Sequence, residues 1–127
     1  MSERSQVEDL VRELHAARLA GDLERLCRVF APDARLRIAG SSDGKPIAID
    51  ASRVARIRPW LSILVKTFRL SRYELLSLTI EGSSAAAHWR VDIESKITGV
   101  CIPTELVDLI EARNGQITSQ IEFFVPC

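Results

Sequence analysis

The chain has 127 residues, 46% of them hydrophobic, and its 17 basic residues balance 17 acidic ones. This length and composition predict one domain over residues 1–127, with enough apolar side chains for a core and an apolar cavity. A net charge of zero gives no broad field for nucleic acid, and the longest apolar run is too short for a bilayer, so we expect no nucleic acid and no membrane as partners.

The N-terminal segment is polar and acidic and contains no hydrophobic signal region, which favours a cytoplasmic location. Three cysteines, Cys27, Cys101 and Cys127, are odd in number and widely spaced. They form no pattern typical of a zinc site, so we expect reduced thiols, no metal and no cofactor.

Apolar residues at helical spacing predict a first helix over residues 6–20, with Ser5 as its N-cap. Gly21 supplies a left-handed end to this helix, and Asp22 is suited to cap a second, short helix over residues 23–30. The two helices should therefore form a tight hairpin.

Pro32 then stops the second helix, and a strand is predicted over residues 32–38, followed by the turn-rich loop "GSSDGKP". A third helix should extend to about Lys66, with Asp50 or Ser52 as its cap. Pro59 lies inside this pattern and should kink the helix or delay its start.

From Phe68 onward the hydrophobic period changes to two, which predicts strands over residues 68–81, 85–97, 101–113 and 116–125. Asn114-Gly115 is a strong hairpin turn. Helices followed by antiparallel strands indicate an α+β fold, in which a curved, mainly antiparallel sheet wraps around three helices.

Three features in this order carry a family resemblance: the Gly21-Asp22 break, "FAPDA" from Phe30, and "NGQITSQIEFF" from Asn114. Together they resemble the nuclear transport factor 2-like superfamily, which includes the SnoaL-like proteins, ketosteroid isomerase and limonene epoxide hydrolase. The resemblance implies a cone-shaped, cystatin-like fold with a pocket for a small molecule. It does not imply one reaction, since the superfamily contains enzymes, binders and assembly modules.

Ketosteroid isomerases use a tyrosine and a protonated aspartic acid to bind the enolate oxygen, and a second aspartate as base. In this chain the resemblance places Leu14 at the tyrosine position and Ile38 at the base position. Asp108 matches the oxyanion-binding aspartic acid. Two of the three groups are apolar, which excludes steroid isomerisation.

Limonene epoxide hydrolase activates water with an Asp-Arg-Asp arrangement that includes an "RVD" strand motif. Arg90 and Asp92 match this motif, and Glu122 falls near the remaining aspartate. One carboxylate would deprotonate water while the other protonates the epoxide oxygen. The water-positioning tyrosine and asparagine of that family are replaced by Leu36 and Ile38, which weakens the hydrolase interpretation.

Strand alternation leaves two interpretations of the segment from His88 to Glu94 open. Either Arg90 and Asp92 face the pocket, or Trp89 and its alternate neighbours do and the charged residues face solvent. On the last strand, both resemblances place Gln120, Glu122 and Phe124 toward the pocket, which leaves Ile121, Phe123 and Val125 on the outer sheet face. His15, beside the apolar stripe of the first helix, is interpreted as a surface or capping residue.

We therefore expect a pocket protein for a small, largely apolar molecule, and its enzymatic form would be a cofactor-free isomerase, cyclase or hydrolase. The candidate catalytic residues are Glu122, Asp108, Asp92 and Arg90. The candidate pocket-lining residues are Leu14, Phe30, Trp60, Phe68, Trp89, Gln120 and Phe124. If Glu122 faces a closed apolar cavity, desolvation should raise its pKa.

The alternative is a non-catalytic dimerising or ligand-binding module. An outer sheet face with Ile121, Phe123 and Val125 would expose an apolar patch, so a homodimer through that face is expected in either case.

Overall fold

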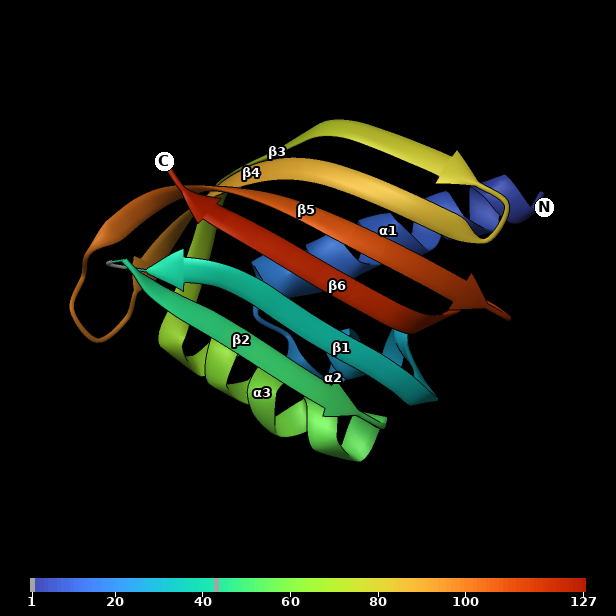
Figure 1. Cartoon of the computed structure of the whole chain (residues 1–127), viewed down its shortest axis with the longest axis horizontal. Coiled ribbons are helices and arrows are strands. Elements are labelled where there is room, and N and C mark those ends of the chain that lie inside the picture. Colours follow the sequence, from blue (N-terminus) through green and yellow to red (C-terminus); the bar gives the residue numbers. More distant parts are fainter. Residues whose placement is uncertain (1, 43) are drawn as a thin grey trace.

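The computed structural model describes residues 2–42 and 44–127, so Asp43 of the predicted turn lies outside the described residues. Three helices and six strands follow one another along the chain (Figure 1). They are α1 (Glu3–Ala20), α2 (Leu23–Arg28), β1 (Phe30–Ser42), β2 (Lys45–Ser52), α3 (Val54–Thr67), β3 (Phe68–Glu81), β4 (Ser84–Ser95), β5 (Cys101–Arg113) and β6 (Gln116–Pro126).

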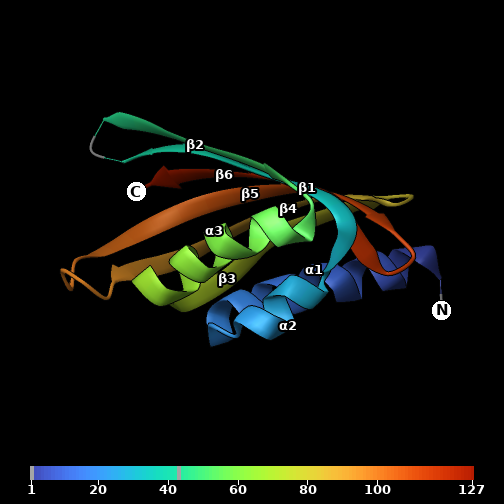
Figure 2. The same cartoon turned by 90° about the horizontal axis from the view of Figure 1, so that it is seen from below.

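The strands form one curved, unclosed sheet in the order β2-β1-β6-β5-β4-β3. All neighbouring strands are antiparallel except β1 and β6, which run parallel. The helices lie together on one side of this sheet and leave its other side uncovered (Figure 2). The predicted α+β fold is confirmed. No helix of the described residues is long and apolar enough to cross a membrane.

The helix ends agree with the sequence only in part. α1 begins one turn earlier than expected, because Ser2 and not Ser5 is its N-cap and accepts a hydrogen bond from the Ser5 N–H. Gly21 ends α1 in the left-handed conformation at φ 65°, and the side chain of Asp22 caps α2 by accepting from the N–H of Arg25. Both residues of the predicted break have the expected roles.

The segment before α3 differs from its prediction. Residues expected to form a loop and a helix cap form the strand β2, so neither Asp50 nor Ser52 caps α3. The N-cap residue is Arg53, which has a φ of 76° and provides no side-chain cap. α3 then continues through Pro59.

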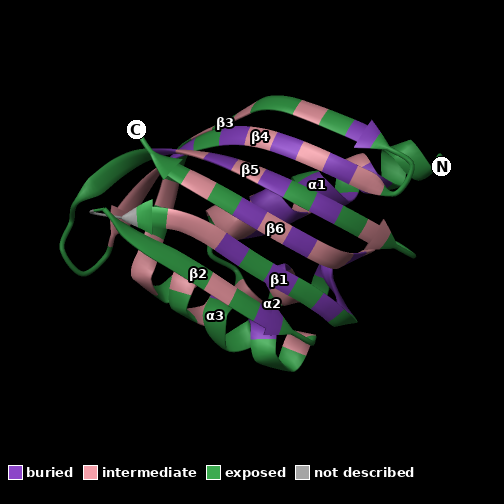
Figure 3. Ribbon diagram, in the orientation of Figure 1, coloured by how far each residue is buried: buried purple, intermediate pink, exposed green. Residues whose placement is uncertain are grey.

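The later strands follow the predicted pattern closely, since β3 and β5 have the expected bounds. Asn114 and Gly115 have φ values of 53° and 74°, which is the backbone of a two-residue hairpin turn. Along β4, β5 and β6, buried residues alternate with more exposed ones, so each strand has an inner face toward the helices and an outer face (Figure 3).

The core consists of two groups of buried side chains. The larger group lies between the helices and the inner face of the sheet and includes Leu14, Phe30 and Leu36. The smaller group, called the Trp89 cluster below, contains Trp89, Val91 and Leu106, and partly buried side chains pack against it. These are Leu19, Leu70, Tyr73, Leu75, Ile93 and Phe124.

Phe124 belongs to the borders of both groups because Gly40 leaves room for it. The two residues are paired across β1 and β6. A Cβ atom on Gly40 would lie 2.5 Å from the Phe124 ring, which is closer than van der Waals contact allows. The absence of a side chain at residue 40 therefore lets the ring lie across β1.

Candidate functional site

Two carboxylates lie side by side on the inner face of the sheet. Asp108 of β5 and Glu122 of β6 are directly paired across the two strands. Their exposed fractions are 0% and 3%. Like charges at paired positions repel, and burying a charge is costly unless it is paired or hydrogen-bonded. Each carboxylate must therefore have compensating partners.

Asp108 accepts hydrogen bonds from nitrogen atoms of three side chains. His15 Nε2 and Trp89 Nε1 lie 2.8 Å and 2.9 Å from Oδ2, and Gln120 Nε2 lies 3.2 Å from Oδ1. Trp89, Gln120 and His15 are themselves buried. This arrangement holds the carboxylate rigidly as a hydrogen-bond acceptor inside the protein.

Glu122 is paired instead with one cation from α1. The Arg18 Nη1 atom donates to Glu122 Oε1 at 2.8 Å, and the guanidinium lies 5.9 Å from the centre of the Trp89 ring. Burial raises the pKa of Glu122, and the charge of Asp108 adds to this effect, while Arg18 opposes it. Among the described side chains none donates to Oε2 of Glu122, which leaves this oxygen free to hold a proton.

α1 supplies two of these partners because His15 and Arg18 are three residues apart and lie on the same face of the helix. This face also carries Leu14 and Val11, which are buried in the core. The sequence interpretation placed His15 at the surface and did not select Arg18. That placement of His15 is wrong, since its exposed fraction is 1%.

The structure does not bring Arg90 and Asp92 to this group. Trp89 and Val91 occupy the inner face of β4, and strand alternation directs their neighbours to the outer face. There Arg90 pairs with Glu74 at 2.7 Å, and Asp92 lies 3.7 Å from Arg72. The expectation that they share a site with Glu122 is therefore corrected.

The candidate pocket-lining residues have different locations. Trp89 and Gln120 contact Asp108 directly, and Phe124 packs against Trp89. The remaining four do not surround the two carboxylates. Leu14 and Phe30 are buried in the larger core group, Phe68 is partly buried at the start of β3, and Trp60 is 40% exposed on α3.

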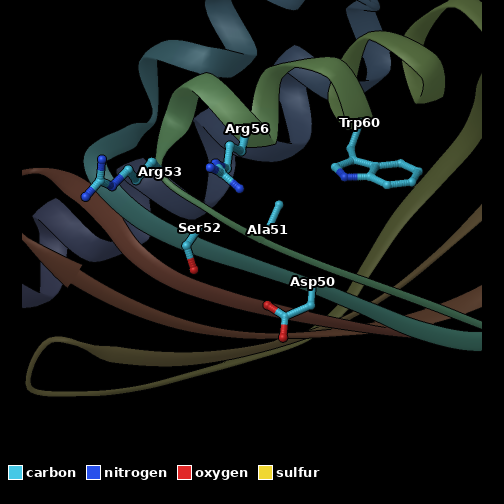
Figure 4. A pocket seen from close by; sticks show the side chains of 6 residues that line it. All are labelled: Asp50, Ala51, Ser52, Arg53, Arg56 and Trp60. Carbon is cyan, nitrogen blue, oxygen red and sulfur yellow. The ribbon is translucent and has the colours of Figure 1, made fainter.

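Trp60 instead lines a surface groove of about 610 Å³ between β2 and α3. Figure 4 shows Trp60 and Arg56 on α3 above this groove, with Asp50 on β2 below. The Asp50 carboxylate is already held by two hydrogen bonds from Arg35. Asp108 and Glu122 line neither this groove nor two smaller surface pockets, and both carboxylates are buried.

Within residues 2–42 and 44–127, no group of three or more His, Cys, Asp or Glu side chains is arranged to hold a metal ion. Glu122 can change between a neutral and a charged form beside a fixed cation, whereas Asp108 is surrounded by donors.

Comparison with known proteins gives one family and many structural neighbours. A family model for the SnoaL-like domain matches residues 11–120. A search of the curated proteins gives no significant match.

Three solved structures illustrate the similarity of fold. A candidate isomerase from Bacillus subtilis is 19% identical with a TM-score of 0.85, and the match covers 98% of this chain and 90% of that one. A candidate SnoaL-like polyketide cyclase from Jannaschia is 16% identical with a TM-score of 0.77, covering 94% and 85%. An epoxide hydrolase from M. tuberculosis, similar to limonene epoxide hydrolase, is 11% identical with a TM-score of 0.74, covering 95% and 84%. At these identities the likeness concerns the fold alone.

The raised pKa of Glu122 predicts how stability depends on pH. The folded chain holds this proton more tightly than the unfolded chain, whose Glu ionises near about pH 4.3. The stability that the group contributes is thus complete below that pH and is lost as the pH rises through the folded pKa. The Glu122→Gln variant has no group to ionise at this position. The free energy of unfolding of the variant minus that of the wild-type protein should therefore increase as the pH rises from about 4 to about 8. Urea denaturation across this range measures the difference, and a difference that decreases with pH would contradict the prediction.

Removal of the cation should destabilise the folded chain. Arg18→Met leaves a buried carboxylate without its partner, which costs about 3–5 kcal/mol in comparable buried pairs. The double variant Arg18→Met/Glu122→Gln should recover most of this loss, because no uncompensated charge then remains. Urea denaturation at neutral pH measures both.

Arg25→Met is the matched control, because the Arg25–Glu13 pair is partly exposed and should matter little. Equal losses in the single and double Arg18 variants would show that the guanidinium does not compensate Glu122.

Proposed function

Because the chain belongs to the SnoaL-like domain family, we propose that its interior binds a small, largely apolar molecule and acts on it by acid–base chemistry without a cofactor. One observation supports this proposal above the others: two buried carboxylates, Asp108 and Glu122, are paired across neighbouring strands but have different partners. Titratable groups in unlike environments are typical of acid–base sites.

Glu122 is the proton-transferring group in this proposal. Burial raises the pKa of Glu122 above that of an exposed glutamate. A carboxyl group with a raised pKa is better suited both to accept and to donate a proton near neutral pH. Arg18 holds one carboxylate oxygen and leaves the other for the ligand. Asp108, fixed by three donors, lies beside Glu122, and its charge opposes the ionisation of Glu122.

The ligand would enter through the Trp89 cluster. The side chains that border this cluster, including Leu19, Leu70 and Phe124, are only partly buried. Trp89 links the apolar cluster to the carboxylates through its hydrogen bond to Asp108. Displacement of the bordering side chains would expose an apolar surface with Arg18 and Glu122 at its inner end, the usual composition of a small-molecule site.

Isomerisation is the reaction that these residues support best, since a single carboxylate can remove a proton from one carbon atom and return it to another. Cyclisation requires the same kind of proton transfer. Hydrolysis of an epoxide by an arrangement that includes Arg90 and Asp92 is less favoured, because both side chains lie on the outer sheet face.

The second candidate function is a non-catalytic dimerising or ligand-binding module. The closed interior favours it, since the exposed fraction of Glu122 is only 3%. In that case the carboxylates and their partners would serve only to fix the packing of α1 against the sheet.

Exchange of carbon-bound hydrogen separates the two functions. The protein is incubated in D₂O with a panel of small cyclic ketones and enones, and proton NMR measures the replacement of C–H by C–D. We expect exchange at a carbon next to the carbonyl for at least one compound, and a decrease of about 10²–10⁴-fold in Glu122→Gln, as is usual for loss of an acid–base residue.

Glu105→Gln is the matched control, because Glu105 lies on β5 but on the outer face, beside His88. It should leave the exchange rate unchanged. No exchange above the solvent rate with any compound, or equal rates in the unchanged protein and Glu122→Gln, would favour the non-catalytic module.

We propose in addition that the protein forms a two-fold homodimer through the outer sheet face. No helix covers this face in Figure 2, and its centre on β5 and β6 is apolar. The exposed fractions of Leu109, Phe123 and Val125 are 42%, 44% and 63%, and Val107 and Ile121 lie between them on the same face. Contiguous apolar patches of this kind usually mark an interface.

Sedimentation equilibrium at micromolar concentration tests the dimer. We expect twice the 14.2 kDa mass of one chain for the unchanged protein. Phe123→Glu should give the single mass while keeping the fold, because a charge at residue 123 cannot be buried against a second copy without a partner. A single mass for the unchanged protein would contradict the proposal.

A further inference from the structure

His15 joins Asp108 to a third polar side chain that the proposed acid–base chemistry does not use. Its Nε2 atom lies 2.8 Å from Asp108 Oδ2, and its Nδ1 atom lies 2.7 Å from the hydroxyl oxygen of Tyr73. The three side chains thus form one hydrogen-bonded row from β5 through α1 to β3. In such a row the imidazole can take a proton from the hydroxyl group, while the carboxylate orients the imidazole and stabilises the imidazolium that forms.

The other partners of Asp108 fix the direction of these hydrogen bonds. The indole of Trp89 can only donate, and it donates to the same Oδ2 atom that faces His15. Gln120 donates to Oδ1. We assign Asp108 as the acceptor from His15 as well, which places the imidazole hydrogen on Nε2. Nδ1 is then an acceptor, and the Tyr73 hydroxyl donates to it.

A β-bulge brings Tyr73 to this position. Ser71 pairs with Asp92 and Glu74 with Arg90, so that two residues of β3, Arg72 and Tyr73, oppose the single residue between them on β4. Arg72 has a φ of 55°, which is rare and unfavourable for a residue with a long side chain. Bulges commonly redirect a side chain next to a functional site. Regular alternation from the inward Leu70 would direct Tyr73 outward.

Tyr73 is also the accessible end of the row. Asp108 and His15 are fully buried, whereas Tyr73 is partly exposed and packs against the Trp89 cluster, where the proposed ligand would enter. Burial raises the pKa of the Tyr73 phenol, so the hydroxyl keeps its proton at neutral pH. Its oxygen has a lone pair left for a hydrogen bond from a ligand.

We propose that Tyr73, supported by His15 and Asp108, is an oxygen-binding site for an apolar ligand that carries a phenol or enol hydroxyl group. This inference rests on the proposed binding function of the interior. The ligand hydroxyl donates to the Tyr73 oxygen while the Tyr73 hydroxyl donates to His15 Nδ1. In the proton-transfer step the ligand O–H bond breaks as a new O–H bond forms on Tyr73, and the original Tyr73 proton moves to Nδ1. Asp108 then stabilises the resulting imidazolium, so no other reactant is needed.

A pair of probes of equal shape tests the site. 2-Naphthol carries the hydroxyl group, and 2-methylnaphthalene has a methyl group in its place. Equilibrium dialysis measures the affinity of each for the unchanged protein and for Tyr73→Phe. We expect the preference for 2-naphthol to decrease about ten-fold in Tyr73→Phe, the effect of one hydrogen bond, while the affinity for 2-methylnaphthalene stays the same.

Nitrogen NMR provides a readout that a purely structural tyrosine would not change. The chain has two histidines, and His88 on the outer face is the internal control. Binding of 2-naphthol should shift the Nδ1 signal of His15 toward that of a protonated nitrogen in the unchanged protein, and should leave His88 unaffected. In Tyr73→Phe the His15 shift should be absent.

An equal preference for 2-naphthol in both proteins would overturn the assignment of Tyr73, even if Glu122→Gln still abolished hydrogen exchange. If neither probe bound the unchanged protein, the interior site and this inference would both be overturned. If the preference depended on Tyr73 but exchange did not depend on Glu122, the oxygen-binding site would stand and the proposed catalysis would fail.

Discussion

The pairing of Asp108 with Glu122 is the constraint on which the interior of this protein depends. Two carboxylates at neighbouring positions cannot both remain charged in a closed interior without nearby donors or cations. Four side chains supply them: Arg18 for Glu122, and His15, Trp89 and Gln120 for Asp108. An entirely apolar inner face would fill the same space without these demands, so the polar group is not needed for stability alone.

The fold brings these partners together from distant parts of the sequence. The inner faces of β4, β5 and β6 present Trp89, Asp108 and Glu122 in adjacent rows. α1 crosses the concave side of the sheet, so one turn near its C-terminal end reaches both carboxylates (Figure 2). The left-handed Gly21 ends the helix three residues after Arg18 and allows α2 to turn back.

Much of the fold and half of the interior group could be predicted from the sequence. Period-two alternation predicts that Gln120 and Glu122 share one face of β6, and the family resemblance assigned that face, together with Asp108, to the pocket. The same alternation on β4 left two choices. The apolar residues took the inner face there because Trp89 and Val91 lose nothing by leaving water, whereas the charged residues that alternate with them would be costly to bury.

The rest required tertiary information. His15 and Arg18 border the apolar stripe of α1, and their spacing of three was a signal, but a polar residue beside such a stripe lies more often at the surface. Tyr73 could not be assigned to the inner face because a bulge interrupts the alternation of β3. No local sequence pattern predicts the position of such a bulge. β2 was missed because its alternation is weak and almost all of it is exposed at the sheet edge.

The gradient of burial along the polar row bears on how a closed interior could serve a ligand. Side chains at the Asp108 end are fixed by several hydrogen bonds and full burial, whereas the apolar side chains that border the Trp89 cluster, such as Leu70 and Phe124, are only partly buried. Displacing the latter costs only the burial of a few partly exposed side chains, and a bound apolar ligand would restore that burial. Displacement is therefore easiest where the Trp89 cluster meets solvent, and the polar side chains that lie beside Trp89 are Arg18 and Tyr73.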